Sequence, residues 1–275
     1  EIESDLGSVE NAIQLFYTWS TQFNFDIIYL QDNLSMIWDA IFELESDLAN
    51  ATSCQLGRYA YCAGADLSYM DLSGMDLTGI DLRGANLQNA TFDYASLDYA
   101  DLRSIVAMNA TFISAGMNYT YLQNAEFNRY GMGCPGGWGQ AGYCGPADLT
   151  GANLQFTDMS NANLTFADLT NANLPYADLT NANLQYADLT DANLKYSQWA
   201  NAHVRAARLI NANLIEADLT DANLRSSYLI DANLLEADLT DANLQYADLT
   251  NANLNDADLT NASLNDADLI NTDLG

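Results

Sequence analysis

Residues 147–186 read ADLTG ANLQF TDMSN ANLTF ADLTN ANLPY ADLTN ANLQY, and the same five-residue pattern continues to Leu274. A large apolar residue recurs at every fifth position, and a small residue, usually Ala, stands two positions before most of them. A period of five matches neither the 3.6-residue turn of an α-helix nor the two-residue alternation of a strand. Each unit therefore predicts a very short strand and a turn, which bury their apolar residues only when the chain coils and successive coils stack.

A second and less regular block of the same repeat precedes this one. Its apolar positions run from Cys62 through Leu67 to Phe127 at the same spacing. Phe127 and Leu149 are 22 residues apart, which is four units plus two residues, so the register breaks between them. Seven glycines among residues 128–146 favour a loop over a helix or a strand in that stretch. The sequence thus divides into a segment 1–53, a first repeat block 54–127, a loop insertion 128–146 and a second repeat block 147–275.

These units resemble the pentapeptide repeat family, whose motif is A-(D/N)-L-x-x, over about residues 60–275. The resemblance implies a mainly β fold, a right-handed, four-sided parallel β-helix (a solenoid) with four units per coil. At four units per coil the two blocks make nearly ten coils, roughly 45 Å in length at an inter-strand spacing of about 4.8 Å. The resemblance identifies a fold and leaves the function open.

Aspartates are expected to line up along the coils. The second block alternates ADLT(N/D) with ANLxY, and this period of ten places like units on opposite faces of a four-sided coil. The sequence therefore predicts one column with Asp148, Asp168 and Asp188, and a column opposite with Asp158 and Asp178. Stacked carboxylates repel unless they accept hydrogen bonds from turn amides or share a cation such as calcium. Local hydrogen bonding in turns is the simpler interpretation, and no other cofactor is predicted.

The segment 1–53 has a different periodicity. Its apolar residues are spaced four and three positions apart over more than six heptads without a proline, which predicts a long α-helix in a coiled coil or bundle. A break near residues 21–26 would instead give a helical hairpin. The apolar surface is wider than a two-stranded seam needs, so we expect several chains to bundle; the alternative is that the segment covers the β-helix. The residues expected to form oligomer contacts are Ile13, Phe16, Ile27, Leu30, Leu34, Ile37, Ile41 and Leu44.

The charge of the chain is strongly unbalanced. Eight Lys and Arg residues stand against 37 Asp and Glu residues, a formal net charge of −29. Such a polyanion does not bind nucleic acid or anionic lipid by charge, and basic proteins or cations are the partners that it favours. The sequence holds no stretch of 18 or more uncharged apolar residues, so it predicts no membrane span. It begins with Glu1 rather than Met, which predicts a processed chain whose signal peptide has been removed.

Cysteines and glycosylation motifs point to an oxidising compartment. Cys54 and Cys62 flank the start of the array, and Cys134 and Cys144 bracket the Gly-rich loop, so we expect two short-range disulfides. Buried free thiols are the alternative, because Cys62 also falls at a core position. Asn-x-Ser/Thr motifs give the glycosylation candidates Asn33, Asn50, Asn89, Asn109, Asn118, Asn163 and Asn261. We therefore expect an extracellular or cell-surface protein.

Departures from the repeat mark candidate contact points. Trp138 lies in the Gly-rich loop, and Trp199, Arg205 and Arg208 interrupt the second block, the two arginines forming a basic patch suited to an acidic face of another copy. Catalysis is not expected, because the chain has one histidine, His203, no nucleophile motif and no clustered metal ligands.

Two functions fit these observations. The first is a structural, self-assembling subunit of a surface filament, fibre or sheath, in which N-terminal helices bundle and an uncapped coil after Leu274 stacks on the next subunit. The second is an acidic, rod-shaped binding module. The family resemblance supports it, since some pentapeptide repeat proteins mimic duplex DNA and bind DNA topoisomerases. An adhesin is a weaker alternative, contacting glycans through tyrosine-rich faces on which Tyr176 stacks on Tyr196 and Phe166 on Tyr186.

Overall fold

The computed structural model describes residues 54–127 and 146–275. The predicted N-terminal helix with its oligomer contacts, the predicted Cys134–Cys144 disulfide and Trp138 therefore lie outside the described residues. Within the described ranges, no helix is long and apolar enough to cross a membrane.

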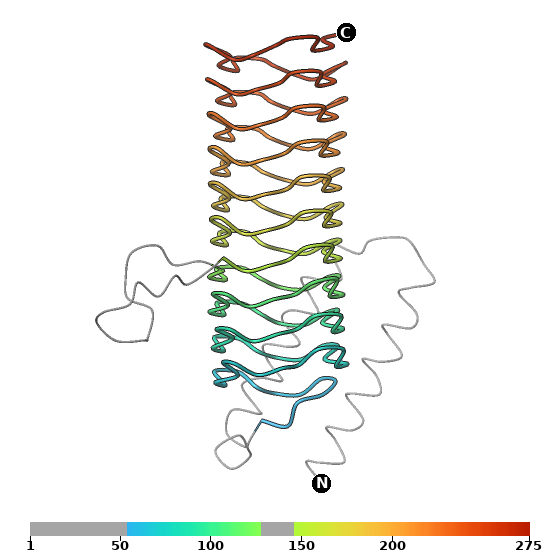
Figure 1. Ribbon diagram of the computed structural model, residues 1–275, viewed down its shortest axis with the longest axis vertical. Coiled ribbons are helices and arrows are strands. Elements are labelled where there is room, and N and C mark those ends of the chain that lie inside the picture. Colours follow the sequence, from blue (N-terminus) through green and yellow to red (C-terminus); the bar gives the residue numbers. More distant parts are fainter. Residues whose placement is uncertain (1–53, 128–145) are drawn as a thin grey trace, which may run out of the picture. The chain divides into compact units, whose positions relative to one another are not determined.

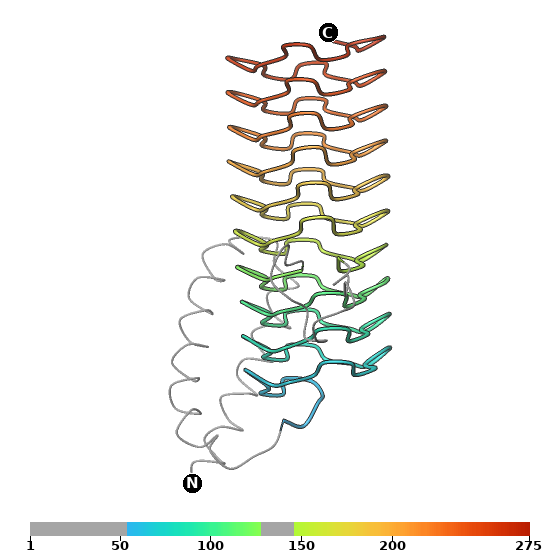
Figure 2. The ribbon, with the colours of Figure 1, turned by 60° about the vertical axis from the view of Figure 1, so that its left-hand side comes forward.

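The described residues form a column of stacked coils (Figures 1 and 2). Outside the insertion, parallel bridges join each bridging residue to the one twenty positions later, as in Asp148 to Asp168. These bridges are isolated, so the described part of the chain contains neither a helix nor a continuous strand. The bridging residues fall into four columns of ten, which define face 1 (Tyr61 to Asp258), face 2 (Asp66 to Ser263), face 3 (Asp71 to Asp268) and face 4 (Asp76 to Asp273). The four-sided β-helix of nearly ten coils is thereby confirmed.

One unit shows how the sequence makes this coil. The N–H of Leu169 donates to the carbonyl of Asp188 in the next coil at 2.7 Å, and the N–H of Asn171 donates to Thr190 at 2.9 Å. Within the unit, the N–H of Ala172 donates to the carbonyl of Leu169 at 3.0 Å, and Asn171 has a φ of 58°. This bond and the positive φ are those of a type II turn, which Asn tolerates better than most residues. Each unit therefore turns a corner and pairs with the coil above.

The core is a set of four columns of apolar side chains inside the coil. The residue after each bridging residue and the residue before it both point inward, so Leu169 and Ala167 are fully buried. Burial of a leucine side chain stabilises the fold by about 1.5–3 kcal/mol, and the lattice repeats this gain along the column.

The insertion leaves the lattice intact. Thr111 bridges to Asp148, 37 residues later rather than 20, so 17 residues have been added to one coil. The N–H of Ala147 donates to the carbonyl of Phe127 at 3.3 Å, the same bond that closes every two-residue turn. Residues 128–146 thus take the place of one ordinary two-residue turn, and the predicted break in register is confirmed.

The predicted columns are also confirmed. Asp148, Asp168 and Asp188 follow one another on face 3, while Asp158 and Asp178 lie on face 1, opposite. The ring of Tyr176 stacks on that of Tyr196 with centroids 4.7 Å apart, and Phe166 stacks on Tyr186 at 4.9 Å.

Candidate interaction surfaces

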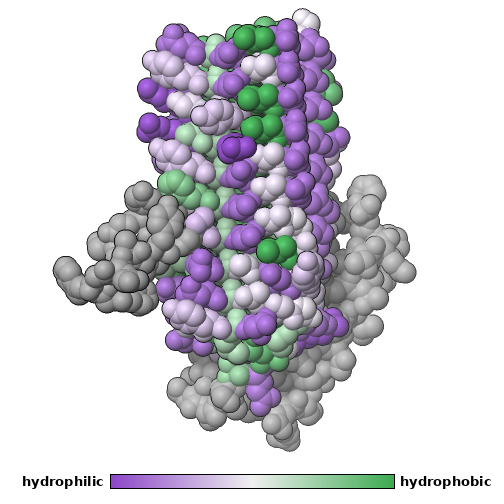
Figure 3. Space-filling model, viewed as in Figure 1, coloured by the Kyte–Doolittle hydropathy of each residue, from purple (hydrophilic) through white to green (hydrophobic). Residues whose placement is uncertain are grey.

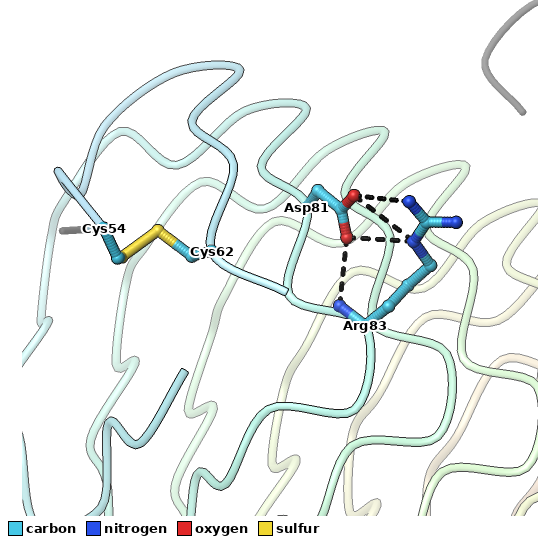
Figure 4. Close-up of a disulfide and its surroundings, with 4 residues drawn as sticks. All are labelled: Cys54, Cys62, Asp81 and Arg83. Carbon is cyan, nitrogen blue, oxygen red and sulfur yellow. Dashed lines mark hydrogen bonds and ion pairs between the residues drawn. A yellow bond between two sulfur atoms is a disulfide. The ribbon is translucent and has the colours of Figure 1, made fainter. Parts of the chain in front are cut away.

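The aspartates on the faces serve the turns. The carboxylate of Asp168 accepts the N–H of Thr170 at 2.9 Å, and the same bond recurs at Asp148, Asp178 and Asp188. Figure 4 shows the arrangement at Asp81, which accepts both the backbone N–H and the guanidinium of Arg83. No group of three or more His, Cys, Asp or Glu residues able to hold a metal ion occurs in the described ranges. The local-turn interpretation of these carboxylates is therefore confirmed at the positions named.

These turn bonds change the acidity of several carboxyls. The hydroxyl of Ser73 donates to Asp71 at 2.6 Å and, with the Ser73 backbone N–H, lowers the pKa of Asp71. The hydroxyl of Thr78 likewise lowers the pKa of Asp76. The side chain and then the backbone N–H of Thr260 lower the pKa of Asp258. The folded state thus holds these carboxylates in their charged form.

Negative charge is concentrated at one end of the column. Residues 216–275, the last three coils, contain 13 Asp and Glu residues and one basic residue, Arg225, for a net charge of −12. The other described residues, 54–127 and 146–215, contain 14 acidic and six basic residues, for a net charge of −8 over seven coils. We call residues 216–275 the acidic coils. Several of their carboxylates, including Glu216, Glu236 and Asp256, stand exposed at turn positions.

The second turn residues, which have positive φ, line up as four corners of the column. We name each corner by the faces that it joins. The 4/1 corner carries a ladder of stacked rings from consecutive coils: Tyr99, Tyr119, Phe156, Tyr176 and Tyr196, with centroids 4.7–5.1 Å apart. Burial raises the pKa of the Tyr99 and Tyr119 phenols. The ammonium of Lys195 lies 4.4 Å from the Tyr196 ring centroid at the upper end of the ladder.

One side of the column is mostly polar. Figure 3 shows a largely hydrophilic face with isolated hydrophobic side chains rather than a continuous apolar patch. Half of the exposed large apolar side chains of the second block are tyrosines, namely Tyr176, Tyr186, Tyr228 and Tyr246. Surfaces of this kind favour charged or polar partners over a hydrophobic docking surface.

The structure separates the arginines that the sequence placed together. Arg208 lies on face 3 and forms a salt bridge with Asp188, Nε to Oδ2, at 3.1 Å. Arg205 lies on the other side of the 2/3 corner and is exposed. Its neighbour in the next coil is Arg225, which our sequence reasoning missed although the two are one coil length of 20 residues apart.

The prediction that Trp199 is an interface residue is wrong. Its side chain is fully buried on face 1, and its indole Nε1 donates to the buried hydroxyl of Ser197 at 2.6 Å. Trp199 stands at the five-residue spacing of the buried leucines, between Leu194 and Val204, so the repeat itself predicts that its side chain points inward.

One of the two predicted disulfides is confirmed. Cys54 is bonded to Cys62 at the start of the array (Figure 4). Cys62 is also buried in the core, so the bond ties the segment before the first coil to the column. The ring of Tyr59 in this segment occupies the space that a side chain at Gly79 would need.

The glycosylation candidates within the described residues differ in accessibility. The amide nitrogen of Asn118 donates to Asp98 at 3.0 Å, and that of Asn163 donates to Glu126 at 3.0 Å, both part-buried. Asn89 and Asn109 lie in adjacent coils of the 2/3 corner, joined by an amide hydrogen bond of 2.8 Å. Asn261 is exposed at a corner. Asn33 and Asn50 lie outside the described residues, and glycosylation stays a prediction.

Comparison with known proteins places these features in a family context. A family model for pentapeptide repeats matches eight copies, over residues 60–97, 147–185, 187–225, 217–256 and 237–275. The chain is similar to the structure of HetL, a pentapeptide repeat protein involved in heterocyst differentiation regulation from the cyanobacterium Nostoc sp. strain PCC 7120. The two are 30% identical, with a TM-score of 0.51 over 83% of this chain and 93% of HetL.

Other solved structures are more distant. QnrB1, a plasmid-mediated fluoroquinolone resistance protein, is 15% identical, with a TM-score of 0.46 over 77% of this chain and 87% of that one. Rfr23, a pentapeptide repeat protein from the cyanobacterium Cyanothece 51142, is 24% identical, with a TM-score of 0.23 over 60% of this chain and 91% of that one. No curated protein sequence matches the chain.

Proposed function

We propose, from the premise that the chain belongs to the pentapeptide repeat family, that its β-helix is a non-catalytic scaffold whose acidic coils bind a basic, DNA-binding surface of another protein. The family fold alone does not assign this function, so the proposal rests on the surface of this particular chain.

The observation that carries the proposal is the charge density of residues 216–275. Three coils at a spacing of about 4.8 Å span roughly 14 Å, so a net charge of −12 gives about one negative charge per 1.2 Å. Duplex DNA carries about one negative charge per 1.7 Å of helix axis. The seven other coils carry a net −8 over roughly 34 Å, or about one charge per 4 Å. Only the acidic coils therefore reach the charge density of DNA, and by this measure they exceed it.

A surface of this kind attracts a DNA-binding protein by the same electrostatics as DNA itself. Its carboxylates are held at fixed spacing by a rigid backbone lattice, and their field draws a basic surface at long range. Binding should therefore compete with duplex DNA and weaken steeply with added salt.

Displacement of DNA tests the proposal. A fluorescent duplex bound to a DNA topoisomerase is titrated with the full-length protein, and fluorescence anisotropy reports release. The test variant neutralises five corner carboxylates, each by Asp→Asn, at positions 221, 231, 241, 256 and 266. Asn already occupies this turn position with positive φ at Asn171, Asn181 and Asn201, so the fold should tolerate the changes.

The matched control neutralises five aspartates of the first coils, again by Asp→Asn, at positions 66, 71, 76, 93 and 98. We expect the corner variant to displace DNA at least tenfold less well than the wild type, and the control to stay within about threefold. Equal losses in both variants, or no displacement by the wild type, would contradict the proposal.

The filament hypothesis remains a prediction, together with an extracellular location. Its main support, the heptads of residues 1–53 and the predicted Cys134–Cys144 disulfide, lies outside the described residues. Electron microscopy of the native material is the direct test, and discrete single particles would count against a fibre. An intact mass under non-reducing conditions would show whether any of the seven candidate asparagines carries a glycan.

A further inference from the structure

We propose that the 2/3 corner carries a seat, made of Arg205, Ala206, Arg225 and Ser226, which binds a column of carboxylates on a second copy of this chain. We call these four residues the arginine seat. The inference concerns self-association and does not rest on the DNA-binding partner proposed above.

The arginine seat lies where two small residues, Ala206 and Ser226, replace the aromatic residues of the 2/3 corner. Going up the 2/3 corner, the second turn residues are Phe166, Tyr186, Ala206, Ser226 and Tyr246, all with positive φ. Phe166 and Tyr186 stack at 4.9 Å, whereas the next two coils have no ring to add. Alanine at positive φ is strained and gains no stacking in return. The rings of Tyr186 and Tyr246 therefore border two coils where the corner is shallow, and a partner can approach the backbone closely.

Two guanidinium groups flank this gap. Arg205 and Arg225 occupy the same turn position in adjacent coils, and both are exposed. The guanidinium of Arg225 lies 5.0 Å from the ring centroid of Tyr246 in the coil above. The residue equivalent to Tyr246 above Arg205 is Ser226, which has no ring. Accordingly, the Arg205 side chain makes no hydrogen bond, salt bridge or ring contact within the described residues.

The local environment explains why this cation needs an external partner. Arg83 and Arg103 each pair with an aspartate in their own unit, at 2.7 and 2.6 Å, and Arg208 pairs with Asp188. The bridging residue in the unit of Arg205 is His203, and that in the unit of Arg225 is Asn223. Neither unit therefore offers a carboxylate like those that neutralise Arg83 and Arg103.

Spacing identifies the partner as a second copy. The two arginines stand one coil apart, about 4.8 Å along the column. The 4/1 corner of the same chain presents Glu216, Glu236 and Asp256, exposed and also one coil apart. None of the three forms a salt bridge with a described residue, unlike the aspartates that pair with Arg83, Arg103 and Arg208. Both columns have the same rise because they belong to the same lattice, so two cations can meet two anions without distortion.

The geometry also determines the kind of assembly. The 2/3 and 4/1 corners are diagonally opposite, so contact between them joins different surfaces of the two copies. Such heterologous contacts repeat rather than close, and they would join columns side by side into rows. Exposed ion pairs contribute little each, so the contact should be weak and sensitive to salt.

Sedimentation of the full-length protein over a range of concentrations and salt tests the seat. The variant Arg205→Gln/Arg225→Gln copies the glutamines that stand at Gln185 and Gln245 in the same column. The control Arg58→Gln/Arg103→Gln removes two positive charges from the first coils and reaches the same net charge. Residues 1–53 are unchanged throughout, so any association through them is common to all three proteins.

We expect the salt-sensitive association constant to fall at least tenfold in the seat variant and by less than twofold in the control. Equal weakening in both, or no salt-sensitive association of the wild type, would overturn the proposal. A second variant, Ala206→Tyr/Ser226→Tyr, fills the gap without changing charge and should weaken association to a similar extent. Thermal unfolding checks that each variant is folded.

A mixing experiment tests the identity of the partner corner. The variant Glu216→Gln/Glu236→Gln/Asp256→Asn lacks the acidic column but keeps the arginine seat. Neither this variant nor Arg205→Gln/Arg225→Gln should self-associate through the corner contact, yet a mixture of the two retains one intact copy of each surface. Energy transfer between differently labelled variants should therefore recover in the mixture and disappear at high salt. No recovery would show that the arginines contact some other surface.

Discussion

The indole Nε1 of Trp199 donates a hydrogen bond to the hydroxyl of Ser197, 2.6 Å away, with both side chains fully buried. The hydroxyl of Ser197 in turn donates to the carbonyl of Leu194 at 2.5 Å. Most other units have Ala and Leu at these two positions. The two departures therefore belong together, because a tryptophan in this core needs an acceptor for its N–H.

We predict that Ser197→Ala destabilises the protein by about 1–3 kcal/mol, because it leaves a buried N–H without an acceptor. In a Trp199→Phe background the same substitution should lower the free energy of unfolding by clearly less. Chemical denaturation of the wild type, the two single variants and the double variant gives the coupling energy between the two side chains. Ser227→Ala is the matched control. Ser227 is buried and donates only to Leu224, so its loss leaves no donor unpaired. Equal costs for Ser197→Ala in both backgrounds would contradict the pairing.

A second prediction concerns the aromatic ladder. Tyr176 stacks on Phe156 and on Tyr196, at 5.0 and 4.7 Å, and has positive φ. The substitution Tyr176→Asn keeps a residue suited to the turn and removes two ring contacts, so we expect a loss of roughly 1–3 kcal/mol in the free energy of unfolding.

The control for the ladder is Tyr94→Asn. Tyr94 holds the same turn position with positive φ, is 70% exposed and has no ring partner among the described residues. This substitution should leave the stability unchanged or raise it slightly, because Asn tolerates positive φ better than Tyr. If both variants lose equal stability, stacking makes no measurable contribution at this corner.

A third prediction concerns acid stability. Hydroxyl and backbone hydrogen bonds lower the pKa of Asp71 and Asp258 in the folded state. A lowered folded pKa gives a contribution that is present above the unfolded pKa of about 3.9 and is lost as pH falls through the folded value. In Asp71→Asn/Asp258→Asn the turn acceptor remains but does not titrate. The stability of the wild type relative to this variant should therefore decrease between pH 5 and the strongly acidic range.

Thermal unfolding of both proteins across this range gives the measurement. The control is Glu236→Gln, which removes an exposed corner carboxylate that accepts no turn hydrogen bond in the described structure. The stability of the wild type relative to this control should not show the same decrease. A wild-type advantage that grows on acidification would contradict the prediction.

A fourth prediction concerns the insertion. Because Ala147 donates to Phe127 as in an ordinary turn, residues 128–146 should be replaceable by the dipeptide Gln-Asn, which occurs at Gln88 and Asn89 in the same corner. Shortening the connection from 19 residues to two lowers the entropy cost of closing it by roughly 2 kcal/mol. We expect the variant to keep its circular dichroism spectrum and to unfold at an equal or higher temperature. Loss of the native spectrum would show that the insertion supports the lattice.

Much of the fold could be predicted because, in a repeat, the spacing of two residues in the sequence determines whether they are neighbours in the structure. Once four units make a coil, residues 20 apart must be neighbours, and this arithmetic alone placed Asp148 beside Asp168 and Tyr176 beside Tyr196. The same arithmetic would have paired Arg208 with Asp188 and set Arg225 above Arg205. Trp199 also stands at a core position of the repeat, and that position alone predicts the burial that the structure shows.

Other features could not be read from the repeat. The backbone bond from Ala147 to Phe127 depends on how the insertion ends, which register counting does not specify. The gap at Ala206 and Ser226 becomes visible only once each corner is followed from coil to coil. The concentration of charge in residues 216–275 was hidden by the total of −29, which averages over the whole chain.

The turn between Phe127 and Ala147 has a consequence for how such a protein evolves. This corner accepts nineteen residues in place of two and keeps its closing hydrogen bond. The sequence of a segment inserted there can therefore change without a change in the stability of the fold. Any corner in the column is in principle an equivalent site of addition, since each is closed by the same local bond. New binding segments can therefore be tried one corner at a time, while selection on the remaining coils keeps the lattice folded.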